Sequence, residues 1–181
     1  MRDINEYDLF EEAKKTIVVV SGYFDPLGSH HIDLFEAAKS IRSNTLLIVG
    51  INSDAACARK KGQPAFMEWG IKSRIVGAIR YVDVVKSFDD SDGTACNLLK
   101  DVYTEYRLLV EYGHADIVFA NGGDRRPDGV PIPEESWANI HYPRIQFLYG
   151  VGGTEKTGAS SLMLKQWAER AIAFRMQRED D

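Results

Sequence analysis

The sequence has little cysteine, no excess of basic charge and no long apolar run. Its two cysteines, Cys57 and Cys96, are far apart, so neither a disulfide framework nor a zinc site is expected. The formal net charge of -5 argues against a general nucleic-acid-binding surface. No apolar stretch approaches the ~20 residues of a membrane helix, and the charged N-terminus is no signal peptide. These absences predict a soluble, cytoplasmic protein without nucleic-acid or membrane partners.

What is present is enough apolar material for one core. The chain has 181 residues, of which 44% are hydrophobic. That length fits a single domain of ordinary size. We expect an N-terminal extension over residues 1–15, with a short helix within 3–15, and a single domain over residues 16–181.

Apolar runs alternate with amphipathic segments along the domain. Runs typical of buried strands occur at residues 16–22, 45–51, 82–88, 115–123 and 144–153. Helical spacing of apolar residues occurs at 29–41, 68–81, 93–113 and 159–176. The segment "RRPDGVPIPEES" contains three prolines and is expected to be irregular. The pattern predicts an α/β fold, a Rossmann-like three-layer sandwich with a five-stranded parallel sheet.

Glycine-rich or polar turns follow four of the expected strands. They read "SGYFDPLGSHH", "INSD", "NGGDRR" and "GVGGTEKTGASS". Because the carboxyl ends of parallel strands share one edge of the sheet, these turns are expected to converge on one site.

Two adjacent histidines, His30 and His31, open the first long helix of the domain. Alone, such a pair is common as a solvated first turn. After a buried strand and a glycine turn, however, the helix start is suited to binding phosphate. His31 is therefore predicted to face a phosphate, while the role of His30 stays open.

The stretch "GYFDPLGSHHIDLFEAAK" resembles the signature of the HxGH nucleotidyltransferase superfamily, G-x-F-D-x-x-H-x-G-H followed by an apolar helix. Other segments are similar to this family in the same order: "LLIVGINSD", "RKKG", "FANGGDR" and "TEKTGASS". "IRYVDVV" is similar to a segment of glycerol-3-phosphate cytidylyltransferases. The resemblance covers roughly residues 17–166.

The resemblance implies a nucleotidyltransferase that transfers CMP from CTP, or less favourably AMP from ATP, to a small phosphorylated acceptor. A polyol phosphate or a sugar phosphate would be such an acceptor, and pyrophosphate would be released. Magnesium is expected on the triphosphate, held by phosphate oxygens and water rather than by protein ligands. A homodimer is also implied.

The resemblance also assigns roles to individual residues. The implied catalytic residues are His31, Lys60 and Lys156, with His30 as a candidate. The implied nucleotide-binding residues are Gly22, Tyr23, Phe24, Asp25, Gly28, Asn121, Gly122, Gly123, Asp124, Arg125, Ser160 and Ser161. Lys61 and Lys72 are expected to contact the acceptor. "RKKG" alone would be an exposed loop, and "TGASS" alone would be a helix N-cap.

The chain departs from the family signature at two positions. Gly28 stands where the family has its first histidine, and His30 stands where it has glycine. On a regular helix, His30 would point about 160° away from position 28. Either His30 replaces the missing group or it blocks the nucleotide. The alternative function is thus a nucleotide-binding homologue with little or no catalytic activity.

The second departure lies at Lys72, which replaces an arginine of the family and lacks its bidentate fork. Two groups of residues elsewhere are expected to be structural. Asp89, Asp90 and Asp92 are predicted to form a solvated turn rather than a metal loop. Leu164, Trp167 and Phe174 on the last helix are predicted to be in the core or an interface.

Overall fold

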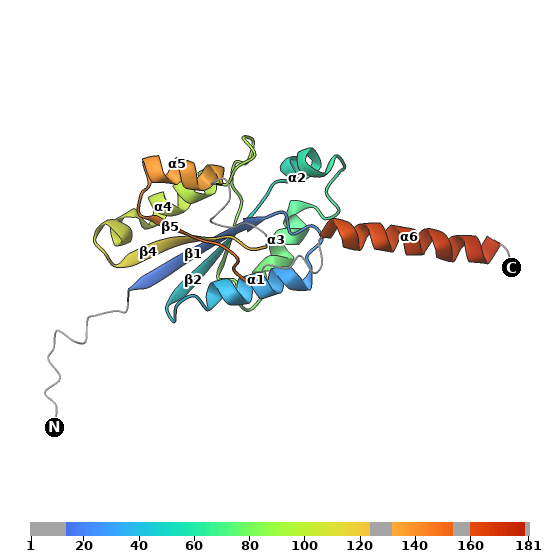
Figure 1. Ribbon diagram of the computed structural model, residues 1–181, viewed down its shortest axis with the longest axis horizontal. Coiled ribbons are helices and arrows are strands. Elements are labelled where there is room, and N and C mark those ends of the chain that lie inside the picture. The colour runs from blue at the N-terminus through green and yellow to red at the C-terminus, as the bar shows by residue number, and fades with distance from the viewer. Residues whose placement is uncertain (1–13, 124–131, 154–159, 180–181) are drawn as a thin grey trace, which may run out of the picture.

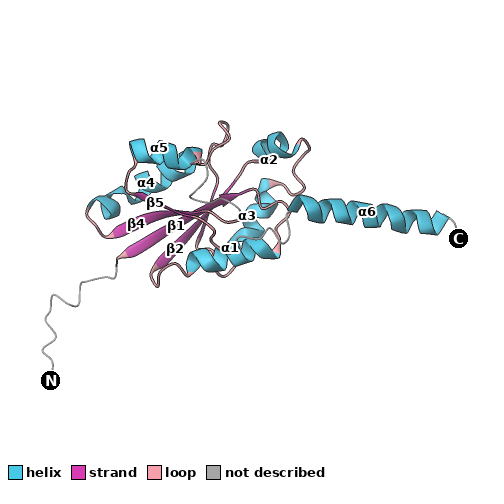
Figure 2. Ribbon diagram, viewed as in Figure 1, coloured by secondary structure: helices cyan, strands magenta, loops and turns pink. Residues whose placement is uncertain are grey.

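Five parallel strands form the centre of the protein (Figures 1 and 2). The computed structural model describes residues 14–123, 132–153 and 160–179. Within these ranges the sheet has the order β3-β2-β1-β4-β5. The strands are β1 (Lys15–Gly22), β2 (Thr45–Ile51), β3 (Val84–Lys86), β4 (Ala115–Ala120) and β5 (Ile145–Leu148).

β1 is the central strand, which explains its continuous apolar sequence. Ile17 pairs with Leu46 of β2 on one side and with Ile117 of β4 on the other. Residues 16–20 are all buried. A strand covered on both faces needs apolar side chains in both directions. Apolar residues therefore follow one another along its sequence instead of alternating with polar ones.

Helices cover both faces of the sheet and complete the three layers (Figure 1). α1 (Ser29–Lys39) and α3 (Trp69–Gly77) pack on one face, and α4 (Cys96–Glu111) and α5 (Pro133–His141) lie on the other. Each face has its own apolar cluster, with Phe35 in one and Leu98 in the other. The predicted Rossmann-like α/β sandwich is confirmed.

Two helices are present that the sequence did not predict. α2 (Asp54–Lys61) includes most of the "RKKG" segment, which was expected to be a loop. Its start is capped by the Ser53 hydroxyl, which accepts a hydrogen bond from the amide of Ala56. α5 begins at Pro133 within the segment expected to be irregular, because proline is tolerated where a helix amide has no partner.

The two ends of the described chain also differ from expectation. The expected helix over 3–15 lies outside the described residues except at its last two positions. Lys14 is not helical, and Lys15 belongs to β1. α6 (Ser160–Glu179) projects from the body of the domain (Figure 1). Trp167 and Phe174 on it are 69% and 61% exposed, so neither lies in the core that the described residues form. None of the described helices has the length and apolar character needed to cross a membrane.

Candidate active site

The turns that follow β1, β2, β4 and β5 meet at the carboxyl edge of the sheet, as the sequence predicts. The amide of Asn52 donates to the carbonyl of Gly22 at 3.0 Å, which joins the first two turns. The amide of Val151 donates to the carbonyl of Asn121 at 3.0 Å, which joins the last two. In this strand order β1 and β4 lead to helices on opposite faces, and ligands of such sheets bind at that switch point.

Glycines let the last two turns approach the middle of α1. A Cβ atom on Gly152 would lie only 2.6 Å from Cα of Leu34, and the φ of Gly152 is 79°. A Cβ on Gly122 would lie 3.2 Å from the carbonyl oxygen of Val151. The backbone of the β4 and β5 turns therefore packs directly on α1. Of the residues predicted there, Asn121 is buried and Gly123 is half-buried, while Asp124 and Arg125 lie outside the described residues.

The β1–α1 turn is built around the buried ring of Phe24. Phe24 has a φ of 46°, which is uncommon for a residue with a side chain. Its ring covers Gly22, where a Cβ atom would lie 2.9 Å from Cζ of the ring. The same ring meets His31 edge-on, with 5.1 Å between the ring centroids. Gly22 and Phe24 thus shape the turn and support the imidazole, and Tyr23 between them is half-buried.

Asp25 anchors this turn to the segment between α2 and α3. Its carboxylate accepts hydrogen bonds from the amides of Phe66 and Met67, at 2.9 and 2.8 Å, and from the thiol of Cys57. Burial acts to raise the pKa of Asp25, but these donors and the Lys61 charge outweigh it and hold the pKa below 3.8. Asp25 is 1% exposed, so it lies beneath the cleft that it was predicted to line.

The side chains of the two lysines at the end of α2 lie in different surroundings. The ammonium of Lys61 lies 3.3 Å from the Asp25 carboxylate and also donates to the backbone carbonyl of Asp25. Lys60 is exposed. Sequence reasoning gave Lys60 the phosphate contact and Lys61 the acceptor contact. The structure brings Lys61 to the β1–α1 turn, through a partner 36 residues away that no local pattern reveals, and both ligand contacts stay predictions.

His31 is held in one tautomer at the start of α1. Its Nδ1 accepts a hydrogen bond from the amide of Gly28 at 3.0 Å, so the proton of the neutral ring is on Nε2. Burial, followed by the nearby His30 and Lys61, lowers the pKa of His31 to about 4. The ring is therefore neutral at pH 7 and can donate one hydrogen bond from Nε2.

The position of His30 corrects the helix-geometry expectation. Gly28 is the N-cap of α1 and has an extended backbone, with φ at -127° and ψ at 170°, so residues 28–31 are not one regular helix. A Cβ atom on Gly28 would lie 2.8 Å from Cε1 of His30. The His30 ring therefore lies where a side chain at position 28 would begin, not on a different face.

The first turns of α6 approach the same place. The sulfur of Met163 would lie 3.4 Å from a Cβ atom on Gly28. Ser160 and Ser161 are the first two residues of α6, one turn before Met163. Lys156 lies outside the described residues.

Lys72 is more deeply buried than we expected of a residue that contacts the acceptor. It is 1% exposed, and its ammonium lies 3.0 Å from the carboxylate of Asp54. Asp54 also accepts a hydrogen bond from the amide of Trp69 at 2.9 Å. Lys72 and Asp54 therefore join α2 to α3 beneath the site, and the acceptor contact stays a prediction.

Asp90 supports the β2 turn and is not part of a solvated turn. It is 3% exposed and accepts hydrogen bonds from the amide and hydroxyl of Ser53 and from the side chain of Asn52. Burial acts to raise the pKa of Asp90, but these donors and Arg59 lower it overall. Asp89 and Asp92 are exposed, as predicted. The sequence signal for Asp90 was weak because three aspartates share the same short segment.

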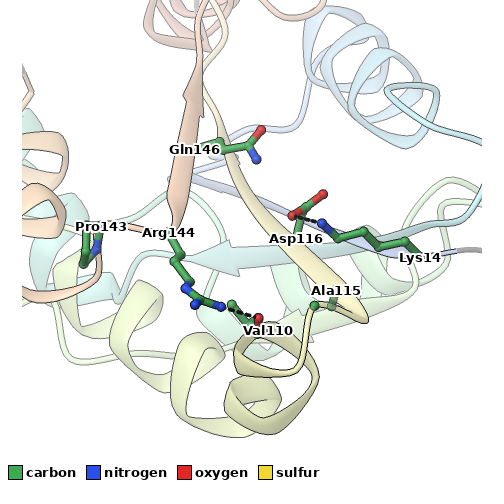
Figure 3. Close-up of a pocket in the computed structure, with 8 residues that line it drawn as sticks. Lys14, Val110, Ala115, Asp116, Pro143, Arg144 and Gln146 are labelled. Carbon is green, nitrogen blue, oxygen red and sulfur yellow. Dashed lines mark hydrogen bonds and ion pairs between the residues drawn. The ribbon is translucent and has the colours of Figure 1, made fainter.

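A separate pocket of about 290 Å³ lies at the opposite edge of the sheet (Figure 3). It is near the amino ends of β4 and β5, where Arg144 donates to the carbonyl of Val110 and Lys14 pairs with Asp116. Its charged groups already have protein partners. The turns, the histidines and Lys61 all lie at the other edge, which is where we place the candidate active site.

The chain is homologous to part of a larger curated protein. It is 31% identical over 125 residues to the bifunctional protein HldE of Citrobacter koseri. The matched region covers 68% of this chain and 23% of that protein. It is 29% identical over 163 residues to the bifunctional protein HldE of Geobacter metallireducens. This matched region covers 88% of this chain and 29% of that protein. The chain thus spans about a quarter of the length of these relatives. No protein-family model matches it.

A solved structure with a similar chain trace is the lipopolysaccharide core biosynthesis protein from Thermoplasma volcanium GSS1. It has a TM-score of 0.49 and 17% sequence identity, and the match covers 77% of this chain and 98% of that chain.

Proposed function

We propose that the protein is a nucleotidyltransferase that transfers a nucleoside monophosphate from a nucleoside triphosphate to a small phosphorylated acceptor. The observation that carries this proposal is His31, a neutral imidazole that carries its proton on Nε2, at the edge where four strand-end turns meet. The family signature around His31 and the homology to part of HldE support the same class of enzyme. Because those relatives are named bifunctional, this chain would correspond to one of their functions.

The proposed reaction needs positioning and charge neutralisation rather than a covalent enzyme intermediate. An oxygen of the acceptor phosphate forms a bond to the α-phosphorus, the bond to the β-phosphate oxygen breaks, and its electron pair leaves with pyrophosphate. Negative charge develops on the phosphate oxygens during this transfer. His31 would donate to one of them from Nε2, and Lys61 would supply the nearby positive charge. Lys60, Lys156 and the start of α6 at Ser160 and Ser161 would contact the outer phosphates.

The nucleotide would lie between the β1 and β4 turns. Gly22, Gly122 and Gly123 would lie along its phosphates and ribose, and Asn121, Asp124 and Arg125 would hold the base side. CTP is the proposed donor, through the similarity of "IRYVDVV" to cytidylyltransferases, and ATP is the alternative. The acceptor would be a sugar phosphate or a polyol phosphate, with Lys72 as its predicted contact.

Magnesium would arrive with the triphosphate. Among the described residues, no cluster of three or more histidine, cysteine or carboxylate side chains could hold a metal ion. Phosphate oxygens and water would be its ligands. A homodimer, on the family resemblance, and a cytoplasmic location, on the composition, complete the proposal.

The test is pyrophosphate release from CTP and from ATP with magnesium, across a panel of sugar phosphates and polyol phosphates. We expect turnover with one nucleotide and one acceptor class, and a loss of about 10²–10³ in kcat for His31→Asn. The surface variant His114→Asn is the matched control and should retain full activity. Turnover that is equal in His31→Asn and the unchanged protein would contradict the proposed site.

The second candidate function is nucleotide binding without catalysis. It is favoured by one observation, namely that Gly28 and His30 interrupt the family signature. This candidate predicts that CTP or ATP binds with measurable heat while no acceptor in the panel leads to pyrophosphate release. The two functions therefore give opposite results in the same pair of assays.

A further inference from the structure

The side chain of Asn52 is oriented by a buried carboxylate at the carboxyl end of β2. Its Nδ2 donates to Oδ2 of Asp90 at 3.0 Å. Asn52 is half-buried, and its backbone amide donates to the carbonyl of Gly22, so it lies between the β1 turn and the loop that follows β3. An asparagine held at one end of its amide presents the other end in a fixed direction.

The charge of Asp90 decides which end of that amide faces it. The carboxylate is 3% exposed and also accepts hydrogen bonds from the amide and the hydroxyl of Ser53, at 2.8 and 2.7 Å. Burial acts to raise the pKa of Asp90, but the hydrogen bonds from Ser53 and Asn52 and the Arg59 charge hold it below its usual 3.8. An ionised carboxylate only accepts hydrogen bonds, so Nδ2 of Asn52 faces it and Oδ1 points away.

The oxygen of the Asn52 amide is left for another donor. No described residue donates a hydrogen bond to this Oδ1. The atom is also not one of the buried side-chain atoms that lack a partner, so solvent reaches it. An accessible acceptor that is already fixed in direction loses little entropy when a donor binds to it. A role limited to joining the two loops would need only Nδ2, and Ser53 already supplies two bonds between them.

The place of Asn52 in the sheet favours the acceptor over the nucleotide as that donor. β1 lies between β2 and β4. With the nucleotide between the β1 and β4 turns, the side of the β1 turn left for the acceptor is that of the β2 turn. Lys61 reaches the same side from α2, and its charge suits the acceptor phosphate. The indole of Trp69 donates to the carbonyl of Ile51 at 3.1 Å, which adds an aromatic side chain at this end of β2.

We propose that Asn52 selects a hydroxylated acceptor, because its Oδ1 accepts a hydrogen bond from an acceptor hydroxyl and Asp90 positions the amide. A sugar phosphate or polyol phosphate makes this contact. A phosphate without hydroxyl groups leaves the oxygen unpaired and binds more weakly. Asn52 is thus a specificity-determining residue and Asp90 a positioning residue. This assignment rests on the proposed function and adds to it the group by which the acceptor is recognised.

The first test compares phosphates with and without hydroxyl groups. The probes are glycerol 3-phosphate beside propyl phosphate, and glucose 1-phosphate beside cyclohexyl phosphate. Calorimetry measures their binding to the full chain with magnesium and α,β-methylene-CTP or α,β-methylene-ATP, which cannot release pyrophosphate. In at least one pair we expect the hydroxylated probe to bind about tenfold more tightly than its analogue. Asn52→Leu should weaken binding of that probe about tenfold and leave binding of the analogue unchanged.

The ratio of affinities within a pair also tests the positioning role of Asp90. Asp90→Asn presents an amide that both donates and accepts, so the Asn52 amide loses its fixed direction and the ratio should fall. A residue that served stability alone would lower the melting temperature and leave this ratio unchanged.

Asn97→Leu is the matched control. Asn97 is also half-buried, and its Nδ2 donates to the backbone carbonyl of Asp89 in the same loop, at 3.0 Å. This variant should keep the full difference within each pair. Thermal unfolding shows which variants keep the fold, and Asn52→Ser keeps the test usable where Asn52→Leu does not fold. An unchanged ratio in a folded Asn52 variant, or no tighter binding of either hydroxylated probe by the unchanged protein, would overturn the proposal.

Pyrophosphate release separates this proposal from the proposed function. With the best acceptor of the panel, Asn52→Leu should raise the acceptor KM about tenfold and leave the nucleotide KM unchanged. If the unchanged protein releases no pyrophosphate but Asn52→Leu still abolishes the difference between paired probes, the transferase function fails and the hydroxyl contact stands. Turnover with the same acceptor KM in Asn52→Leu and the unchanged protein would refute the hydroxyl contact while the function stands.

Discussion

The Lys61 ammonium lies 3.3 Å from the Asp25 carboxylate, although the two residues are 36 positions apart in the chain. The Lys61 side chain is 16% exposed and that of Asp25 is fully buried. This pair joins the end of α2 to the β1–α1 turn, so the floor of the candidate active site depends on it.

Removal of the Asp25 charge should destabilise the protein strongly. Asp25→Asn leaves the Lys61 ammonium without its counter-ion and weakens the bonds from the amides of Phe66 and Met67. Loss of one partner of a buried pair typically costs about 3 kcal/mol, which urea unfolding would measure. Lys60→Met is the control and should change the free energy of unfolding by less than about 0.5 kcal/mol, because Lys60 is exposed. Equal stability of both variants would contradict the role of the pair.

The free energy of unfolding should decrease as the pH is lowered through the range in which His31 titrates. The pKa of His31 falls from 6.5 in the unfolded chain to about 4 in the folded protein. Between these values only the unfolded chain takes up the proton, so stability is fully present above pH 6.5 and is lost as the pH falls towards 4. The loss amounts to at most about 3 kcal/mol.

Unfolding in urea between pH 2 and pH 8 would measure this dependence. His31→Asn should flatten the curve in that window and leave a second, more acidic loss. The second loss comes from Asp25 and Asp90, whose folded pKa values lie below 3.8, so their stabilisation disappears only below that pH. A His31→Asn curve parallel to that of the unchanged protein would show that His31 is not the titrating group.

Lys72 and Asp54 should differ in what their removal does to stability. Lys72→Met replaces a fully buried cation by an apolar chain of similar volume, a change that is often neutral or stabilising. Asp54→Asn leaves that cation buried without its counter-ion and should cost about 3 kcal/mol in thermal or urea unfolding.

The same pair tests the predicted acceptor contact of Lys72. If Lys72 contacts the acceptor phosphate, Lys72→Met raises the acceptor KM at least tenfold while stability is unchanged. An unchanged acceptor KM in this stably folded variant would limit Lys72 to joining α2 and α3.

Two neighbouring glycines offer a matched comparison of backbone contact and backbone strain. Gly152→Ala adds a methyl group 2.6 Å from Cα of Leu34 at a φ of 79° and should cost about 3 kcal/mol. Gly153→Ala also has a positive φ, of 105°, but its new methyl group meets no atom of the described residues within 4 Å and should cost only about 1 kcal/mol. Comparable melting temperatures for the two variants would show that the β5 turn does not pack on α1 as described.

The sheet was predictable from sequence because its strands are buried on both faces. Thr45–Ile51 was predicted with its observed bounds, and β1 differs by one residue. The helices that were missed lack that kind of signal. Asp54–Lys61 is short and ends in three basic residues, and the prolines before Pro133 obscured the helix that starts there.

The site was predictable in outline but not in its pairings. The convergence of the turns followed from strand direction alone. The partner of Lys61 did not, because contacts between distant loops leave no periodic pattern in the chain. The position of His30 was also missed, since it depends on Gly28 having an extended backbone where helical geometry was assumed.

The direction of α6 gives the protein a built-in optical probe. Trp167 is 69% exposed and lies one turn beyond Met163, whose sulfur would lie 3.4 Å from a Cβ atom on Gly28. The other two tryptophans, Trp69 and Trp137, are half-buried, and the indole of Trp69 donates to the carbonyl of Ile51. In a variant that keeps Trp167 alone, iodide quenching of its emission would report whether this helix shifts when the proposed nucleoside triphosphate is added, without any added label.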